Sequence, residues 1–241
     1  MKKVAIIGFG AFGKLAASHL KGKFEVVVSD SEQKQGEARK LGVRQVAIED
    51  AARAEVIILC VPISQMQSTL RDIAPKARPG TLVLDACSVK VLPCRLMESM
   101  LPADVEVIGT HPLFGPQSAG NGIRGQQIVV CPVRSKRTEK VCAFLKEMGL
   151  EVVLLTAEEH DKLMASTQVI THFVGRALAK ISPKDPPTRL KSHEKMMAAV
   201  EMVQHDSDQL FFDIETLNPF ALHERRRLLK ELERIEKELE K

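Results

Sequence analysis

The stretch Val4-Ala5-Ile6-Ile7-Gly8-Phe9-Gly10-Ala11-Phe12-Gly13 joins an apolar, strand-like run to three glycines spaced Gly-x-Gly-x-x-Gly. A helix-like segment over residues 11–21 follows at once. Between a strand and a helix this spacing is typical of a dinucleotide site. The first glycine allows a tight turn, the second admits a pyrophosphate, and the third permits close helix–strand packing. The pyrophosphate would face the free N–H groups at the helix N-terminus. A glycine-rich turn without a ligand is the alternative interpretation.

The second strand-like run ends at Ser29-Asp30-Ser31, about 20 residues after the glycine motif. A carboxylate in this place accepts hydrogen bonds from an adenosine ribose and repels a 2′-phosphate. The sequence therefore predicts NAD as the cofactor, with NADP as the alternative because Ser29, Ser31 and Lys34 could still bind a phosphate. The residues expected to bind the cofactor are Gly8, Phe9, Gly10, Ala11, Phe12, Gly13, Ser29, Asp30, Ser31, Cys60 and Val61.

Outward from this unit, short β-branched runs alternate with longer amphipathic ones as far as about residue 156. This alternation predicts an α/β fold, a doubly wound, mostly parallel Rossmann sheet covered by helices on both faces. Strands are expected over residues 4–8, 24–29, 56–61, 81–86, 106–109, 127–131 and 151–155. Helices are expected over residues 11–21, 32–41, 64–73, 89–101 and 135–148.

After residue 156 helical periodicity dominates, with breaks at residues 182–187 and at Asn218-Pro219. Thr156 and Glu159 have the spacing of a capping box, which predicts a helix start. We therefore expect a dinucleotide-binding Rossmann domain over 1–155 and a small all-helical dimerisation and substrate domain over 156–241. So small a domain is often completed by a second subunit. One apolar face that suits a homodimer interface is formed by Leu228, Leu232, Ile235 and Leu239.

Composition argues against several classes of protein. The net charge is only +4 and the chain has no Trp and no Tyr, whereas a nucleic-acid surface combines basic residues with aromatic ones. The longest apolar run is Val56 to Val61, and a membrane-spanning helix needs about 20 residues. With no targeting segment before the first strand, a cytoplasmic location is expected. Cysteine and histidine spacings predict neither a disulfide nor a metal site.

Two predicted strands end in residues that can carry chemistry. The run 81–86 continues into Cys87-Ser88-Val89-Lys90, and the run 106–109 continues into Thr110-His111-Pro112. Ligands of doubly wound sheets lie beyond the carboxyl ends of the strands, so Ser88 and His111 should both reach the cleft. A histidine can take a hydroxyl proton while a hydride leaves, and a serine can hold that hydroxyl. We expect both to be catalytic. A loop histidine packed between prolines is the alternative for His111.

A further pattern lies in the helical part, over residues 166–176. Gln168, His172 and Arg176 are four residues apart and share one face of an otherwise apolar helix. A polar stripe on a buried helix costs free energy unless it meets a polar partner. That partner is either another polar element of the fold or an anionic substrate, and residue types alone leave both open.

These motifs resemble the arogenate/prephenate dehydrogenases of tyrosine biosynthesis, most closely the plant-type arogenate branch. The resemblance covers nearly the whole chain, through the glycine motif, residues 85–90, 110–118, Glu159-His160-Asp161, 168–176 and 206–211. It implies a homodimeric, NAD(P)-dependent oxidoreductase that converts arogenate to tyrosine by oxidative decarboxylation. In such an enzyme His111 would accept the C4 hydroxyl proton while hydride passes to the nicotinamide. Loss of carbon dioxide would then restore an aromatic ring.

The resemblance also implies a set of substrate-binding residues. Asp206 matches a position where arogenate-using members carry an acid, and a carboxylate there would favour the ammonium of arogenate over the keto group of prephenate. Plant-type members carry a basic residue where Asp30 stands, so their NADP use need not extend to this chain. The expected set is Gln117, Ser118, Gln168, His172, Arg176 and Asp206.

Three alternatives stay open. One is a prephenate dehydrogenase that yields 4-hydroxyphenylpyruvate. A second is a β-hydroxyacid dehydrogenase, although those depend on a lysine in the helical domain, and none of Lys162, Lys180 and Lys184 lies on the polar face. The third is a non-catalytic dimer that senses NAD.

Overall fold

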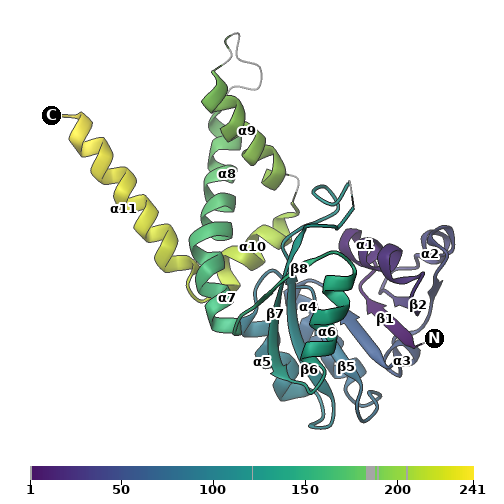
Figure 1. Ribbon diagram of the computed structural model, residues 1–241. Coiled ribbons are helices and arrows are strands. Elements are labelled where there is room, and N and C mark those ends of the chain that lie inside the picture. Colours follow the sequence, from purple (N-terminus) through teal and green to yellow (C-terminus); the bar gives the residue numbers. More distant parts are fainter. Residues whose placement is uncertain (1, 121, 183–187, 189, 205) are drawn as a thin grey trace. The chain divides into compact units, whose positions relative to one another are not determined.

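The computed structural model describes residues 2–120, 122–182, 188, 190–204 and 206–241 (Figure 1). Contacts divide the chain into two compact units, Met1–His160 and Asp161–Lys241. The sequence places this division between residues 155 and 156. The difference arises because His160, in the first helix after that point, packs against His111 of the first unit. No helix in the described part of the chain is long and apolar enough to cross a membrane.

The first unit is built on one eight-stranded sheet of order β3-β2-β1-β4-β5-β6-β7-β8. All neighbouring strands are parallel except β6 and β7, which confirms the predicted α/β, mostly parallel sheet. The strands are β1 (Lys3–Ile7), β2 (Glu25–Ser29), β3 (Arg44–Gln45), β4 (Val56–Leu59), β5 (Leu82–Asp85), β6 (Glu106–Pro112), β7 (Gln127–Arg134) and β8 (Glu151–Leu154).

Helices cover both faces of this sheet. Ile108 of β6 packs with Cys142 of α6, while its neighbour Gly109 faces Cys94 of α5. Successive residues of a strand point to opposite faces, so α5 and α6 lie on opposite sides of the sheet (Figure 1). The helices of this unit are α1 (Ala11–Leu20), α2 (Gln35–Leu41), α3 (Ile48–Ala51), α4 (Ile63–Ile73), α5 (Val91–Met100) and α6 (Thr138–Glu147).

Several features of the first unit differ from the sequence prediction; for example, β7 ends at Arg134 where the predicted strand ends at residue 131. The region between residues 42 and 55, for which no element is expected, contains the two-residue strand β3 and the one-turn helix α3. Both are too short to show a periodic pattern. The predicted strand end at residue 109 is wrong, because β6 continues to Pro112. Antiparallel pairing with β7, in which His111 faces Val129, holds these extra residues in the sheet.

The second unit is helical, as predicted. Its elements are the part of α7 (Ala157–Met164) that follows His160, the π-helical segment η1 (Ala165–Val169), α8 (Ile170–Ile181), α9 (Lys191–Gln204), α10 (Asp208–Leu217) and α11 (Ala221–Leu239). The predicted capping box is confirmed: Glu159 accepts from the Thr156 N–H at 2.9 Å, and the Thr156 hydroxyl accepts from the Glu159 N–H at 3.1 Å. The predicted break at 182–187 falls almost wholly outside the described residues.

The core of this unit is small. Ala165, Val169, Ile214 and Ala221 form its buried cluster. Helices α8 and α9 approach closely at Gly175, where a Cβ atom would lie 2.5 Å from the Val203 side chain. Any larger residue there would push the two helices apart.

Candidate active site

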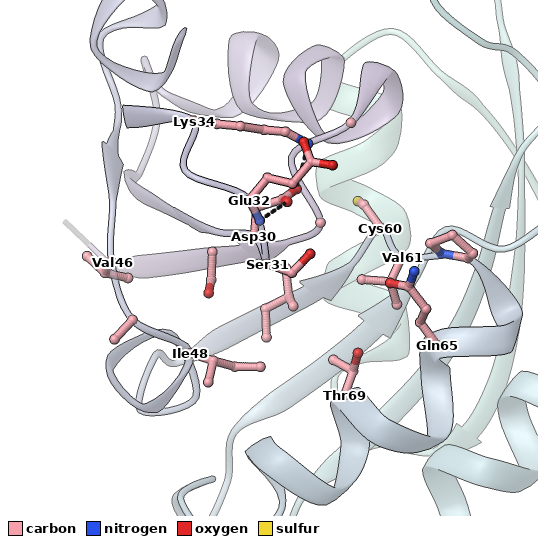
Figure 2. Close-up of a pocket in the computed structure, with 16 residues that line it drawn as sticks. Asp30, Ser31, Glu32, Lys34, Val46, Ile48, Cys60, Val61, Gln65 and Thr69 are labelled. Carbon is pink, nitrogen blue, oxygen red and sulfur yellow. Dashed lines mark hydrogen bonds and ion pairs between the residues drawn. The ribbon is translucent and has the colours of Figure 1, made fainter. Parts of the chain in front are cut away.

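A pocket of about 400 Å³ opens at the carboxyl ends of β1, β2 and β4 (Figure 2). It lies where the strand order reverses, since β2 and β3 extend from one side of β1 and β4 from the other. Doubly wound sheets bind their ligands at such a switch point. Seven of the residues predicted to bind the cofactor line it: Gly8, Gly10, Ser29, Asp30, Ser31, Cys60 and Val61.

Local geometry explains the three motif glycines. Gly8 has φ +94°, and a Cβ there would lie 2.4 Å from the Cys60 carbonyl oxygen. A Cβ on Gly13 would lie 2.0 Å from the Gly8 carbonyl oxygen, so this glycine lets α1 pack directly on the turn. The position of a Cβ on Gly10 has no described atom within 4 Å. Open space before the N-terminus of α1 fits a pyrophosphate.

The other four predicted cofactor residues are not among those that line the pocket. The Phe9 side chain is buried in the hydrophobic core beside β1, and Gly13 packs beneath the turn. The ring centroid of Phe12 lies 6.3 Å from that of Phe114. Ala11 begins α1.

Asp30 stands at the centre of the pocket wall with three hydrogen-bond donors around it. Its carboxylate accepts from the Phe9 N–H at 2.6 Å and the Glu32 N–H at 3.0 Å. The Lys34 ammonium lies 3.2 Å away and pairs with Glu32 as well. Burial raises the pKa of Asp30, but these hydrogen bonds and the lysine charge outweigh it and the net pKa is lowered. Asp30 is therefore an anion at neutral pH.

Eight pocket residues were not expected from the sequence. Figure 2 shows Val46 and Ile48 on one side of the pocket, and Gln65 and Thr69 on the other. The first two come from the β3–α3 region and the second two from α4. The full set is Ile7, Glu32, Val46, Ala47, Ile48, Pro62, Gln65 and Thr69. Residues 43–48 carry no alternating apolar pattern, so no signal in the sequence indicated the β3 side of the pocket.

A buried ion pair organises the ends of β5 and β6. Oδ2 of Asp85 accepts a hydrogen bond from the Cys87 N–H at 3.0 Å, and Oδ1 accepts one from the Thr110 N–H at 3.1 Å. The Lys90 ammonium pairs with Asp85 and donates to the Thr110 carbonyl oxygen at 2.7 Å. Both charged side chains are inaccessible to solvent. We call Asp85, Lys90 and the backbone groups of Cys87 and Thr110 that they bind the Asp85 anchor.

The two residues predicted to be catalytic directly follow this anchor. Ser88 comes after Cys87 and is half-buried, and His111 comes after Thr110 and is 3% exposed. One carboxylate thus fixes the backbone just before each of them. The strands β1, β4, β5 and β6 run parallel, so these residues lie at the same edge of the sheet as the pocket.

His111 contacts a second histidine that the sequence analysis did not assign to the site. Its Nδ1 lies 2.8 Å from Nε2 of His160, and the two rings meet edge to face at 73°. Burial lowers the pKa of His111 well below its usual value, and His160 and the Lys90 charge lower it further. His111 is therefore neutral at neutral pH and can accept a proton. In the sequence, this partner lies in the motif Glu159-His160-Asp161, which was the signal that could have indicated it.

The remaining predicted residue pair of the first unit lies in the loop after β6. Gln117 and Ser118 are both exposed. The Ser118 hydroxyl accepts a hydrogen bond from the Gly115 N–H at 2.9 Å.

The second unit holds the other predicted substrate residues. Gln168 lies in the π-helical segment η1, so the angle between its side chain and that of His172 differs from the angle on a regular α-helix. Such segments frequently occur at functional sites. Its Oε1 is buried and has no hydrogen-bond partner among the described residues. Nε2 of His172 lies 3.7 Å from Oδ2 of Asp206. Burial lowers the pKa of His172, and Asp206 opposes this only in part.

Arg176 is already engaged within its own unit. Its guanidinium forms an ion pair with Asp208 and stacks 4.3 Å from the ring centroid of Phe211. Ser207 provides the N-cap of α10 by accepting from the Leu210 N–H, and Asp206 lies just before this cap.

Comparison with known proteins identifies the family. The model of the prephenate dehydrogenase nucleotide-binding domain matches residues 16–154. The chain belongs to the arogenate/prephenate dehydrogenase family. A second family description, TYRAAT1-like, C-terminal domain, matches residues 177–241.

Curated relatives in this dehydrogenase family are similar over most of the chain. Arogenate dehydrogenase 2, chloroplastic, of Arabidopsis thaliana is 30% identical over 98% of this chain and 70% of its own length. Arogenate dehydrogenase 1, chloroplastic, of the same plant is 33% identical over 92% of this chain and 37% of its own length. The probable arogenate/prephenate dehydrogenase of Methanocaldococcus jannaschii is 32% identical over 90% of this chain and 52% of its own length. The chain thus spans between 37% and 70% of the length of these relatives.

Solved structures of family members show the same fold. Prephenate dehydrogenase from A. aeolicus, in complex with hydroxyphenyl propionate and NAD+, has a TM-score of 0.73 at 20% identity, covering 100% of this chain and 88% of that one. Synechocystis arogenate dehydrogenase has a TM-score of 0.63 at 21% identity, and the match covers 99% of this chain and 89% of that one.

Proposed function

We propose that this protein catalyses the NAD-dependent oxidative decarboxylation of arogenate to tyrosine. The observation that carries the proposal is His111, a buried neutral imidazole fixed by the Asp85 anchor at the sheet edge where the nucleotide pocket opens. A dehydrogenase acting on an alcohol needs a proton acceptor next to its nucleotide. The family and its curated arogenate dehydrogenases support the choice of reaction.

Each chemical step assigns a task to a residue of this chain. When bound, the nicotinamide of NAD supplies the hydride acceptor. Nε2 of His111, the ring nitrogen that does not contact His160, accepts the proton of the C4 hydroxyl as C4 loses its hydride. Ser88 holds the oxygen of the new carbonyl by donating a hydrogen bond. The ring carboxylate then leaves as carbon dioxide, its bonding electrons restore the aromatic ring, and His111 returns the proton to the ring oxygen.

The charges around Asp30 favour NAD over NADP. Asp30 is an anion, and Lys34, the cation beside it, is paired with both Asp30 and Glu32. A 2′-phosphate would meet a surplus of negative charge here. A carboxylate has about four acceptor sites, and the three described donors leave room for a ribose hydroxyl.

We infer that residues of the second unit, together with Gln117 and Ser118, bind the substrate. The Asp206 side chain is 33% exposed, which leaves its carboxylate accessible to the ammonium that distinguishes arogenate from prephenate. The unpartnered amide oxygen of Gln168 and the neutral ring of His172 are further polar contacts of this unit. Arg176 would bind a substrate carboxylate in competition with Asp208.

We also propose a homodimer formed through the second unit. Along α11, three of the four residues of the predicted apolar face are strongly exposed: Leu232 at 52%, Ile235 at 46% and Leu239 at 79%. Burial of such side chains against a second copy is favourable by about 1.5–3 kcal/mol each when complete. A cytoplasmic location stays a prediction from the sequence.

One assay tests the proposed reaction. The purified protein is incubated with NAD or NADP and with arogenate or prephenate, while reduced cofactor is followed by absorbance and the product by chromatography. We expect reduction of NAD with arogenate and release of tyrosine. Faster conversion of prephenate would reassign the substrate. NAD binding without turnover of either compound would instead identify a sensing protein.

A further inference from the structure

His111 and His160 share a hydrogen bond that can hold only one proton. Nδ1 of His111 and Nε2 of His160 are 2.8 Å apart, and both side chains are buried, His160 completely. When two imidazole nitrogens share a hydrogen bond, one nitrogen carries the hydrogen and the other accepts it. The pair therefore has two arrangements, which differ in the tautomer of His111.

Only one of these arrangements makes His111 a base. If His111 Nδ1 donates to His160, its Nε2 has a free electron pair and can accept a substrate proton. If His160 donates instead, Nε2 of His111 already carries a hydrogen and cannot accept another. The hydrogen bond at one ring nitrogen thus decides the chemistry available at the other.

We propose that His160 is a positioning residue that accepts the Nδ1 hydrogen of His111 and so holds Nε2 ready to take the substrate proton. This inference rests on the proposed function. The same contact restrains the His111 ring, because rotation about its side-chain bond would break the hydrogen bond inside a closed region. Acid residues serve as such acceptors in other enzymes. Here the acceptor is a second imidazole in place of a carboxylate.

Two substitutions separate the acceptor role from simple filling of space. In His160→Gln, the side-chain amide oxygen can occupy the place of Nε2 and accept the hydrogen, although it cannot take up a proton. In His160→Phe, the volume is retained but the acceptor is lost. His223→Gln, at a histidine of α11 whose side chain is 78% exposed, is the matched control. Circular dichroism and the Kd for NAD verify that each variant is folded and binds the nucleotide.

Kinetics give the first measurement. We expect His160→Phe to lower kcat by at least about tenfold, toward the roughly 10⁴-fold loss seen when a histidine base adopts the wrong tautomer. The KM for NAD should not change, and His160→Gln should recover most of kcat. Full activity of His160→Phe would overturn the proposal. Equal losses in both variants would overturn it too, in favour of a proton relay through His160.

Nitrogen-15 NMR of the histidine rings gives a second measurement that needs no turnover. The signals of His111 are assigned from their absence in His111→Asn. We expect the wild-type protein to carry the hydrogen on Nδ1 of His111, and His160→Phe to shift His111 toward the other tautomer. A hydrogen on Nε2 in the wild type contradicts the inference. If the wild type reduces no cofactor, the proposed function fails, while this spectrum still decides the role of His160. If His160→Phe does not fold, the wild-type spectrum and His160→Gln decide it.

Discussion

The side chains of Asp85 and Lys90 form an ion pair from which solvent is completely excluded. Breaking a buried pair by removing one partner leaves an uncompensated charge and costs about 3–5 kcal/mol. Lys90→Met should therefore lower the free energy of unfolding by about that amount in urea titrations. Lys14→Met removes a lysine from an exposed pair with Glu37 and should cost at most about 1 kcal/mol. Similar losses in the two variants would show that the Asp85 anchor is not a major stabilising element.

Removing the imidazole of residue 111 should abolish turnover without affecting the nucleotide pocket. General-base catalysis contributes about 10²–10⁴-fold, so His111→Asn should lower kcat with arogenate by that factor. His111 is not among the residues that line the pocket, so the Kd for NAD should stay the same. Stopped-flow or steady-state absorbance gives kcat, and calorimetry gives Kd. Turnover near the wild-type level would remove His111 from the mechanism.

The pKa of His111 sets the acid limit of activity. Burial lowers this pKa well below the usual 6.5, and a base works only while deprotonated. A plot of kcat/KM for arogenate against pH should therefore stay level through pH 6.5 and fall only at a lower pH. A fall in kcat/KM on the acid side whose midpoint lies at pH 6.5 or above would indicate that the base is a different, solvated group.

The lowered pKa of His111 also makes the free energy of unfolding depend on pH. Between the lowered folded pKa and 6.5, the unfolded chain binds a proton at His111 that the folded protein does not. Stability contributed by the neutral histidine is thus complete above about pH 6.5 and is lost as pH falls below it. His111→Asn should unfold with a weaker pH dependence than the wild type between pH 6.5 and 5. Parallel curves for the two proteins would mean that His111 titrates normally.

Asp30 should determine the choice between NAD and NADP. In Asp30→Ser, the charge that repels a 2′-phosphate is removed and Lys34 keeps only Glu32 as a partner. A single charge about 4 Å away contributes several kcal/mol at an intermediate dielectric. The ratio of the NADP and NAD affinities should consequently rise by at least about tenfold, or 1.4 kcal/mol. Glu25→Gln, at the opposite end of β2, is the control. An unchanged ratio would exclude Asp30 as the selector.

Much of the first unit follows from sequence, because its long strands and helices carry strong periodic patterns. The glycine motif also predicts the correct edge of the sheet, since Gly8 and Gly13 leave no space for a Cβ atom and Gly10 borders open space. The β3–α3 side of the pocket does not follow, because a two-residue strand has no period to detect. For the same reason the chain between residues 42 and 55 gave no warning of Val46 and Ile48.

Contacts between residues far apart in the chain are the part of the site that could not be predicted from the sequence. His160 lies 49 positions from His111, and no local pattern links them. The role of Asp85 as an anchor likewise depends on the pairing of β5 with β6, which brings Thr110 to a carboxylate 25 residues away. The π-helical segment at Gln168 also escapes a helical pattern, because one extra residue in a turn changes the direction of later side chains without changing composition.

The apolar face of α11 provides the test of the proposed homodimer. Leu232 and Ile235 are exposed on this helix, and a charge among them would have to be buried without a partner on dimerisation. Leu232→Glu should therefore convert a dimer of the wild type to a monomer, as measured by sedimentation velocity at micromolar concentration. Lys230→Glu makes a larger charge change on the other side of α11 and should leave the dimer intact. A wild-type protein that sediments as a monomer, or a Leu232→Glu dimer as stable as the wild type, would show that this face does not form the subunit interface.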